Sequence, residues 1–397
     1  MNILFISPNS PFESIGGIER YLLNLMDYFQ NKKDFNIVIA LPTSGESYTK
    51  KKDGITIYFS ENLNPASANG EQKGISKKAR LFSKEIEEIL KNHSIDIICA
   101  ENFHLGVPAV YSLLLNMVAG LNDIPLVLRV HSFAKTELQE ELIKQLMWKR
   151  ISCVSKSVTG DCFHKGADIN ILSTDYLGVN TDVFKDQPKA NTIKKSLGLA
   201  DKNKIILAAT RIVEGKRNIL QEKGLINLIQ AFSKISPRYP DLRLLLAVGK
   251  PPERLINEFN QAHEMLMGYI KLHNIVDQTI VKTFGLDEMP LVYRESDVFV
   301  LPSENETFGQ VFIEAMASGL PTIGAKVGGV PEIISDSYNG YLVQPNDSTI
   351  LAQKIEKLIT DTKTRDKFSK AGIKTVQNRF SLEDQFLSYT KMLEKII

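Results

Sequence analysis

Short, nearly continuous apolar runs alternate along this chain with longer segments in which apolar residues recur every three or four positions. Short Ile, Val and Leu runs are typical of strands buried on both faces of a parallel sheet, and the longer segments have the period of amphipathic helices. Strands are predicted at 3–7, 37–41, 55–59, 95–100, 126–130, 151–154, 205–209, 242–248, 279–281, 298–301, 322–323 and 340–343. Helices are predicted at 18–30, 76–92, 105–119, 135–149, 225–235, 253–273, 289–295, 310–318 and 331–335.

This alternation runs through the chain twice, with a polar, proline-bearing stretch at 184–200 between the two passes. Such a pattern predicts two doubly wound, Rossmann-like α/β domains, and a length of 397 residues suits two domains. From residue 348 the chain is almost all helical, with a break at 380–381. Ligands of doubly wound sheets bind outside the carboxyl ends of the strands, so two such domains are expected to face a central cleft lined by those ends.

Two candidate motifs of the first domain follow strands in this way. The segment 8–20 carries the adjacent glycines Gly16 and Gly17 just before a helix, where backbone can approach an anion closely. The spacing is not that of a dinucleotide fingerprint, and a tight strand-to-helix turn is the alternative. His131 comes directly after the strand at 126–130, and a structural histidine is the alternative there.

Cations and carboxylates follow the strands of the second domain. Arg211 ends the first strand region, and Lys216 and Lys223 precede the next helix, so they are candidates for a diphosphate site or a solvated basic loop. The loop after 298–301 carries Glu306, and a helix predicted to start near Phe308 carries Glu314. Free amides of Phe308, Gly309 and Gln310 would hold phosphates at that helix end. A glycine pair in 327–332 is expected to form a second wall of the phosphate pocket.

Composition narrows the possible functions. With 48 Lys and Arg against 46 Asp and Glu, the net charge of +2 lacks the excess of a nucleic-acid binder. The three cysteines lack the spacing of metal ligands, which argues against a disulfide scaffold or a zinc site. No Asp-x-Asp pair lies in a loop where it could hold a metal ion. The chain shows neither the basic leader of a signal peptide nor an apolar run long enough for a membrane span, so a cytoplasmic location is expected.

Together these motifs resemble the retaining family 4 glycosyltransferases of the GT-B fold, also called group 1. The resemblance covers nearly the whole chain and is densest over 205–347. It rests on Glu306 and Glu314 within P-S-x-x-E-x-F-G…E-A-M-A-x-G-x-P, on Gly328-Gly329-Val330-Pro331-Glu332, on Asn339-Gly340 and on Pro345-Asn346-Asp347.

The resemblance implies a domain order and residue roles. It makes 1–184 the acceptor-side domain, 185–380 the nucleotide-sugar donor domain, and 381–397 a helix that crosses back to the first domain. His131, Glu306, Arg211 and a lysine become the catalytic set: His131 contacts the transferred sugar, Glu306 its hydroxyls, and the two cations the diphosphate. Donor-binding residues are then Gly16, Gly17, Phe308, Gly309, Gln310 and Glu314, the last toward the ribose, with Lys216 as the alternative diphosphate ligand.

The family usually has Arg, four residues, then Lys-Gly. Lys216 keeps that spacing from Arg211, whereas Lys223 keeps the following glycine and the helix register, so we expect an insertion in 214–221 and prefer Lys223. The family's Asn-Gly-Val-Asp block is Leu177-Gly178-Val179-Asn180 here. The expected reaction transfers a hexosyl unit with retention from a UDP- or GDP-sugar, without metal or other cofactor.

Alternatives remain open at this point: a nucleotide-sugar epimerase or phosphorylase of similar fold, and a catalytically silent nucleotide-sugar-binding subunit. The acceptor is a hydroxyl on a glycan, a lipid-linked glycan or a small molecule, and no nucleic acid is expected as partner. Residues 73–90 form a basic amphipathic helix. It predicts peripheral contact with the inner face of the membrane, unless its apolar stripe packs on the sheet and its lysines are solvated.

Overall fold

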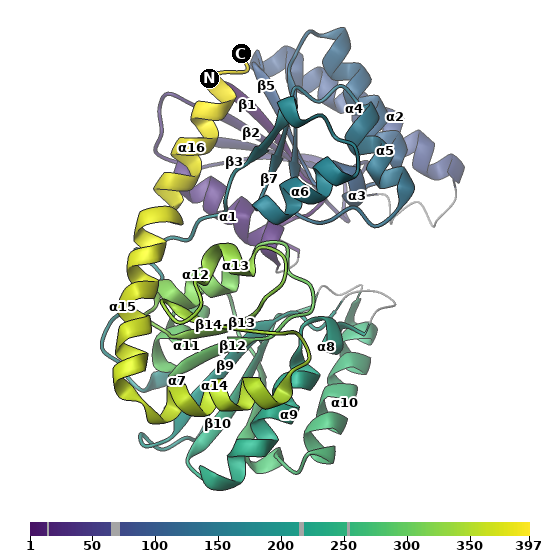
Figure 1. Ribbon diagram of the computed structural model, residues 1–397. Helices are drawn as coiled ribbons and strands as arrows, with labels where there is room; N and C mark the ends of the chain where they lie inside the picture. The colour runs from purple at the N-terminus through teal and green to yellow at the C-terminus, as the bar shows by residue number, and fades with distance from the viewer. Residues whose placement is uncertain (14–15, 65–71, 214–217, 252–254) are drawn as a thin grey trace. The chain divides into compact units, whose positions relative to one another are not determined.

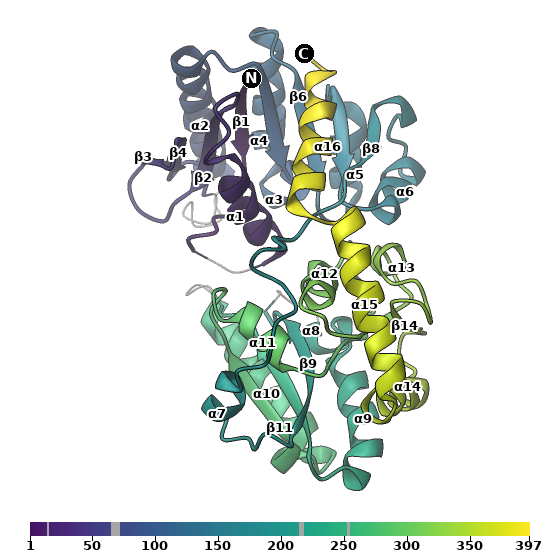
Figure 2. The same cartoon turned by 90° about the vertical axis from the view of Figure 1, so that its left-hand side faces the viewer.

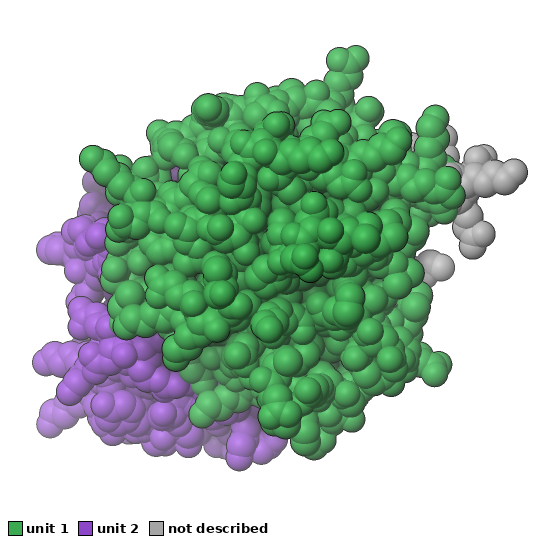
Figure 3. All heavy atoms as spheres, turned by 90° about the horizontal axis from the view of Figure 1, so that it is seen from above, with its two compact units in different colours: residues 1–13, 18–177, 383–397 green, residues 14–17, 178–382 purple. Residues whose placement is uncertain are grey.

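A computed structural model describes residues 1–13, 16–64, 72–213, 218–251 and 255–397. The chain forms two compact units, which Figure 3 distinguishes by colour. Unit 1 comprises 1–13, 18–177 and 383–397, and unit 2 comprises 178–382 together with Gly16 and Gly17. The chain thus passes between units at 177/178 and 382/383, where the sequence placed boundaries at 184/185 and 380/381.

Unit 1 is built on an eight-stranded sheet of order β3-β4-β2-β1-β5-β6-β7-β8. All neighbouring strands are parallel except β3 and β4, which pair antiparallel at one edge. The strands are β1 (Asn2–Ile6), β2 (Asn36–Pro42), β3 (Tyr48–Lys52), β4 (Ile55–Ser60), β5 (Ile97–Glu101), β6 (Leu126–Val130), β7 (Arg150–Cys153) and β8 (Leu172–Thr174).

Helices cover both faces of this sheet (Figures 1 and 2). Because right-handed crossovers leave β1 in both directions along the sheet, α1 lies on one face and α2, α4, α5 and α6 on the other. The helices are α1 (Gly17–Phe29), α2 (Gln72–His93), α3 (Phe103–Gly106), α4 (Ala109–Leu121), α5 (Glu137–Gln145) and α6 (Lys156–His164), with a 3₁₀ turn at Ile169–Ile171.

Unit 2 is built on a six-stranded parallel sheet of order β11-β10-β9-β12-β13-β14. Its strands are β9 (Lys204–Thr210), β10 (Leu242–Val248), β11 (Thr279–Thr283), β12 (Val298–Leu301), β13 (Thr322–Ala325) and β14 (Gly340–Val343). The central strands β9 and β12 are buried apart from the two end residues of β9, because helices pack on both faces. The predicted fold class, two doubly wound α/β domains, is therefore confirmed.

Helices of unit 2 precede its first strand, connect the strands and follow the last strand. They are α7 (Thr192–Ser196), α8 (Ile219–Glu222), α9 (Leu225–Ile235), α10 (Ile256–Leu272), α11 (Met289–Glu295), α12 (Gln310–Ala317), α13 (Val330–Ile333), α14 (Ser348–Thr360) and α15 (Thr362–Arg379), with 3₁₀ turns at Ser236–Arg238 and Val276–Gln278. Asp347 caps α14 by accepting hydrogen bonds from the amides of Thr349 and Ile350.

Several elements differ from the sequence prediction. The strand β3 was not predicted, because Tyr48–Lys52 is exposed throughout and carries no apolar pattern. The predicted helix at 105–119 is two helices, α3 and α4, because Pro108 interrupts it. The helix predicted over 135–149 ends at Gln145, and α6 was not predicted.

The apolar stripe of α2 faces inward. Phe82, Ile86, Ile89 and Leu90 are buried, and the Phe82 ring lies 5.8 Å from the ring of Tyr111 on α4. This stripe therefore belongs to the core of unit 1. No helix in the described part of the chain is both long and apolar enough to span a bilayer.

The last helix, α16 (Leu382–Glu394), packs on unit 1 beside α1. The ring of Phe386 stacks on Tyr28 with centroids 4.8 Å apart. Just before α16, the backbone amides of Val179 and Leu382 bond the carbonyls of Phe380 and Val179, so the two segments that connect the units run side by side.

A fully buried cation on β6 links α16 to the sheet. The Arg129 guanidinium donates to Ser152 Oγ at 2.8 Å and to the Asp175 carbonyl at 3.1 Å. Its carbon lies 4.9 Å from the ring centre of Tyr21 on α1 and 4.5 Å from that of Tyr389 on α16. Two aromatic faces therefore replace part of the hydration that this cation loses on burial.

Replacing Tyr389 by Ala should lower the unfolding free energy of unit 1 by about 3–5 kcal/mol, because it opens a cavity and removes one face from the Arg129 guanidinium. The chain has one tryptophan, Trp148, which is buried in unit 1, so urea unfolding followed by its fluorescence reports on that unit. Leu387→Ala, at an exposed position of the same helix, is the control and should change the free energy by less than about 1 kcal/mol. Equal losses in both variants would contradict the role of Tyr389.

Candidate functional site

The carboxylate loop of unit 2, Pro302–Gly309, joins β12 to α12. Helix α12 begins at Gln310 rather than near Phe308, because Gly309 is its N-cap with a φ of +102°. An added Cβ at Gly309 would lie 2.8 Å from the Phe312 ring, so glycine is required there. Glu306 thus lies on the loop, three residues before the cap.

Glu314 lies one turn inside α12 and is 4% exposed. The Tyr293 hydroxyl, from α11, donates to its Oε2 at 3.0 Å. Tyr293 is in turn fixed between the rings of Phe184 and Phe299, with centroids 5.9 and 5.7 Å away. Glu314 therefore does not belong to a solvated helix face.

The glycine pair at 328–329 packs directly on the carboxylate loop. An added Cβ at Gly328, where φ is +50°, would lie 1.7 Å from the Glu306 carbonyl oxygen. The Gly329 amide donates to the same oxygen at 3.1 Å, and an added Cβ at Gly329 would lie 2.6 Å from the Thr307 carbonyl. The backbone of Glu306 is therefore held by a segment that admits no side chain.

A basic segment closes the other side of this loop. Lys223 follows α8, and its Nζ lies 3.5 Å from Glu306 Oε2, with both side chains mostly buried. Gly224, at a φ of +68°, packs on the Pro302 carbonyl, where an added Cβ would lie 2.0 Å away. The Glu304 amide donates to the Glu222 carbonyl at 2.9 Å. The structure thus brings Lys223 and Glu306 together.

The other cations are placed differently. Arg211 is exposed just after β9, and its Cγ would lie 3.2 Å from a Cβ added at Gly249. No described residue forms an ion pair with its guanidinium. Lys216 and half of the expected insertion at 214–221 lie outside the described residues, which resume at Asn218.

The candidate histidine of unit 1 forms a buried pair. His131 Nε2 lies 2.7 Å from Oε2 of Glu101, at the end of the neighbouring strand β5, and Glu101 is fully buried. The His131 amide donates to Asn102 Oδ1 at 3.0 Å. Burial lowers the pKa of His131, and the hydrogen bond to Glu101 opposes that effect. The neutral ring therefore donates through Nε2, and Nδ1 is left as the acceptor.

Two residues beside His131 were not predicted from the sequence: Glu101 and its neighbour Tyr21, whose hydroxyl lies 3.4 Å from Glu101 Oε1. A signal was present, because Glu101 ends the apolar run of β5 and is paired in register with Arg129 on β6. A carboxylate at the carboxyl end of a buried strand has the same position that singled out His131.

The glycine pair of unit 1 lies at the start of a helix. Gly17 begins α1 and Gly16 precedes it, but residues 14–15 of that motif lie outside the described residues.

A second buried histidine, His104 on α3, lies near this pair. Its Nε2 is 3.2 Å from the Ser132 carbonyl, so Nε2 carries the proton. Its Nδ1 is buried and has no hydrogen-bond partner among the described residues. Burial lowers the pKa of His104 to about 4, because a proton on Nδ1 would bring charge to a site without an acceptor.

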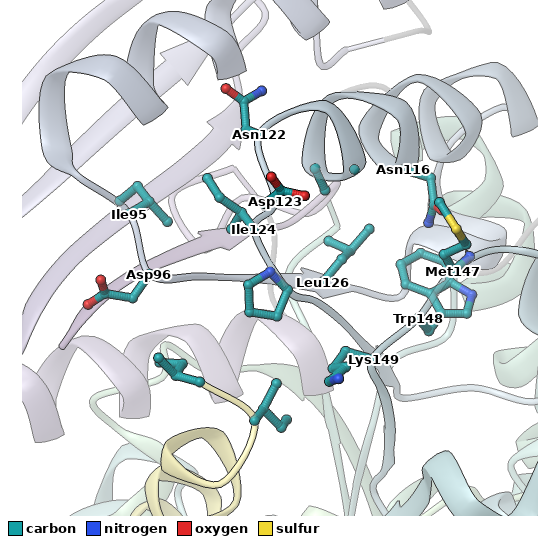
Figure 4. A pocket seen from close by; sticks show the side chains of 15 residues that line it. Ile95, Asp96, Asn116, Asn122, Asp123, Ile124, Leu126, Met147, Trp148 and Lys149 are labelled. Carbon is teal, nitrogen blue, oxygen red and sulfur yellow. The ribbon is translucent and has the colours of Figure 1, made fainter.

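One cavity of about 750 Å³ opens at the opposite edge of the unit 1 sheet (Figure 4). Residues that precede β5, β6 and β7, among them Asp96, Pro125 and Lys149, line it with Trp148 and the C-terminal Ile397. It therefore lies at the amino ends of these strands, away from His131 and Glu101.

Among the described residues, no three or more His, Cys, Asp or Glu side chains are grouped closely enough to hold a metal ion.

Two family models match this chain, one in each half. The model of Glycosyltransferase Family 4 matches residues 15–182, and the model of Glycosyl transferases group 1 matches residues 189–375. The chain therefore belongs to these glycosyltransferases, and its two units have their GT-B fold.

Individual relatives are distant. Sulfoquinovosyl transferase SQD2 of Arabidopsis thaliana is 24% identical over 93% of this chain and 68% of its own length. N-acetyl-alpha-D-glucosaminyl L-malate synthase of Bacillus anthracis is 30% identical over 48% of this chain, and the match spans less than half of that enzyme, 45%. The crystal structure of Anabaena HepE in complex with UDP and glucose has a TM-score of 0.77, with 99% of both chains covered and 18% identity. At that identity the likeness shows the fold alone.

The lowered pKa of His104 predicts an acid-sensitive unit 1. An unfolded histidine titrates near pH 6.5, so between about pH 6.5 and 4 the unfolded chain binds a proton that the folded chain does not. The unfolding free energy should therefore fall as the pH falls through this range. His104→Gln, which keeps a donor for the Ser132 carbonyl, should flatten that dependence by up to about 1.4 kcal/mol per pH unit in Trp148-detected urea unfolding.

The matched control is His164→Gln, at an exposed position on α6 of the same unit. It should leave the slope of unfolding free energy against pH unchanged. An unaltered slope in His104→Gln would show that other groups carry the acid sensitivity.

Proposed function

We propose that this chain is a retaining glycosyltransferase that moves a hexosyl unit from a UDP- or GDP-linked sugar to a hydroxyl acceptor, a glycan, a lipid-linked glycan or a small molecule. The observation that carries the proposal is the Lys223–Glu306 pair, held 3.5 Å apart on glycine-supported loops at the carboxyl ends of β9 and β12. A nucleotide-diphosphate sugar presents anionic oxygens beside neutral hydroxyls. An ammonium next to a carboxylate matches that pattern.

Each charged residue has a role in this proposal. Lys223 and the exposed Arg211 bind the diphosphate and stabilise the charge that develops as it leaves. Glu306 accepts hydrogen bonds from the sugar hydroxyls. The first amides of α12, at Gln310 and beyond, add donors for phosphate oxygens.

Glu314 is the proposed partner of the ribose hydroxyls. Its carboxylate has more than one acceptor site, so it can keep the Tyr293 bond and accept a second donor. His131 contacts the transferred sugar, with its ring orientation fixed by Glu101 and Asn102. The configuration at the anomeric carbon is retained if the acceptor attacks from the face that the diphosphate leaves. In that scheme the departing phosphate takes the acceptor's proton. The cations named above supply the positive charge, without a metal ion. HepE, determined with UDP and glucose, supports a nucleotide-sugar donor.

The proposal is tested first by a thermal-shift screen of UDP-, GDP-, ADP- and dTDP-sugars, because a donor that binds only the folded chain raises its melting temperature. The stabilising donor is then supplied with isotopic label and candidate acceptors, and the anomeric configuration of the product is read by NMR. A labelled glycoside with the donor's configuration supports the proposal. An inverted product, an epimerised nucleotide sugar or a sugar phosphate would overturn it.

Glu306→Gln and Glu314→Gln should each lower kcat/KM by roughly ten- to a hundred-fold, because each removes a charge-assisted hydrogen bond to the donor worth about 1.5–3 kcal/mol. Urea unfolding should stay close to wild type. Glu258→Gln, at an exposed position on α10, is the matched control and should keep full activity. Wild-type turnover in Glu314→Gln would refute the ribose role.

Lys223→Ala should weaken binding of the product nucleoside diphosphate by about ten-fold or more, whereas Lys216→Ala should weaken it by less than about three-fold, as measured by calorimetry. The reason is the placement of Lys223 against Glu306. A reversed ranking would make Lys216, which keeps the family spacing from Arg211, the diphosphate ligand. Equally small effects would remove the lysine from the proposal.

A further inference from the structure

The outer side of α4 is unusually apolar. Leu113, Met117 and Leu121 are 52%, 51% and 74% exposed, and their spacing of four residues places them in one row along the helix. The helix contains no charged residue. Its opposite side, with Tyr111, Leu115 and Val118, already fills the core. The exposed row is therefore in excess of what folding of unit 1 requires.

Met147 extends this row at the end of α4. Its side chain is 74% exposed, and its Cε would lie 3.5 Å from a Cβ added at Gly120. The Met147 amide is anchored by Asn116 Oδ1 at 2.9 Å, so the loop after α5 holds this methionine against α4. We name Leu113, Met117, Leu121 and Met147 the α4 row. A row of exposed apolar side chains on a helix without charged residues is typical of an interaction surface.

Cations run alongside the α4 row on α2, which packs against α4 through Phe82 and Tyr111 and lies next to it in Figure 1. The exposed positions of α2 include Lys77, Arg80, Lys84 and Lys91, which we name the α2 row; they span about 21 Å of helix. Glu88 is also exposed on this side of α2. Glu85 faces inward, where it accepts from Asn62 Nδ2 at 2.7 Å and from the Ser60 hydroxyl.

We propose that this face of unit 1 rests on an anionic lipid bilayer, with the α4 row in the acyl boundary and the α2 row on lipid phosphates. An apolar row flanked by cations is the pattern of interfacial membrane helices. The cations extend along the whole of α2 instead of converging on one point, which matches a continuous anionic surface better than a single acidic side chain. The membrane contact expected from 73–90 alone is thus moved, because Phe82, Ile86, Ile89 and Leu90 of α2 are buried, whereas α4 carries a row of exposed apolar side chains.

This proposal uses exposed residues that have no role in the proposed transfer reaction, so it does not rest on that activity. The full chain is sedimented with vesicles of phosphatidylcholine alone or with about one third phosphatidylglycerol, at low and high salt. The wild-type chain should bind the anionic vesicles at low salt and release them at high salt. It should not bind the neutral vesicles. Two triple variants test the two rows. One replaces Leu113, Met117 and Leu121 of the α4 row by Gln, and the other replaces Lys77, Arg80 and Lys84 of the α2 row by Gln. Each should reduce the partition coefficient onto anionic vesicles about ten-fold or more.

Unit 2 offers matched controls. Met265→Gln, Leu272→Gln and Val276→Gln remove three equally exposed apolar side chains, and Lys363→Gln, Lys370→Gln and Lys374→Gln remove three exposed cations from α15. Both should keep wild-type binding, and far-ultraviolet circular dichroism, which reports on both units, should show that all variants are folded. The proposal is overturned if no vesicle is bound, if neutral vesicles bind equally, or if the controls lose as much. It is also overturned if the α4 triple variant instead abolishes a self-association seen in analytical ultracentrifugation, which would make the face a contact between copies.

Discussion

Parallel strands that are buried on both faces must satisfy their backbone N–H and C=O groups with neighbouring strands, and their connections must cross back over the sheet. The carboxyl ends are then the places where polar side chains can stand without disturbing the core. Arg211 and Glu306 in unit 2, and Glu101 and His131 in unit 1, each follow or end such a strand. In each unit the candidate functional residues therefore lie at the carboxyl ends of the strands of its own sheet.

In unit 2, backbone contacts fix the position of charge. The Glu306 loop lies between two glycine segments, at Gly224 and at Gly328–Gly329, where side chains would collide with carbonyl oxygens. This close packing orients Lys223 and Glu306 before any ligand arrives, and preorganised charge is the form in which a protein stabilises a developing anion. Glu314 is preorganised by a different means, the buried hydroxyl of Tyr293.

In unit 1, the candidate site and the last helix are coupled through Arg129. This residue is the register partner of Glu101 and lies two positions before His131, and its guanidinium is enclosed by Tyr21 and by Tyr389 of α16. A buried cation requires such compensation. The final helix thus completes the surroundings of the Glu101–His131 pair, although its residues are the last in the chain.

Apolar runs and glycine pairs are local signals, so the class of fold could be predicted from the residues alone. The same signals placed His131, Arg211, Lys223, Glu306 and Glu314 after or near buried strands. The sequence did not predict the edge strand β3, whose exposed residues have no apolar pattern. It also missed Glu101, whose importance appears only when β5 pairs with β6. The burial of the α2 stripe and the exposure of the α4 row were decided by tertiary packing, since both helices are apolar enough to supply a core and only one face of each can do so.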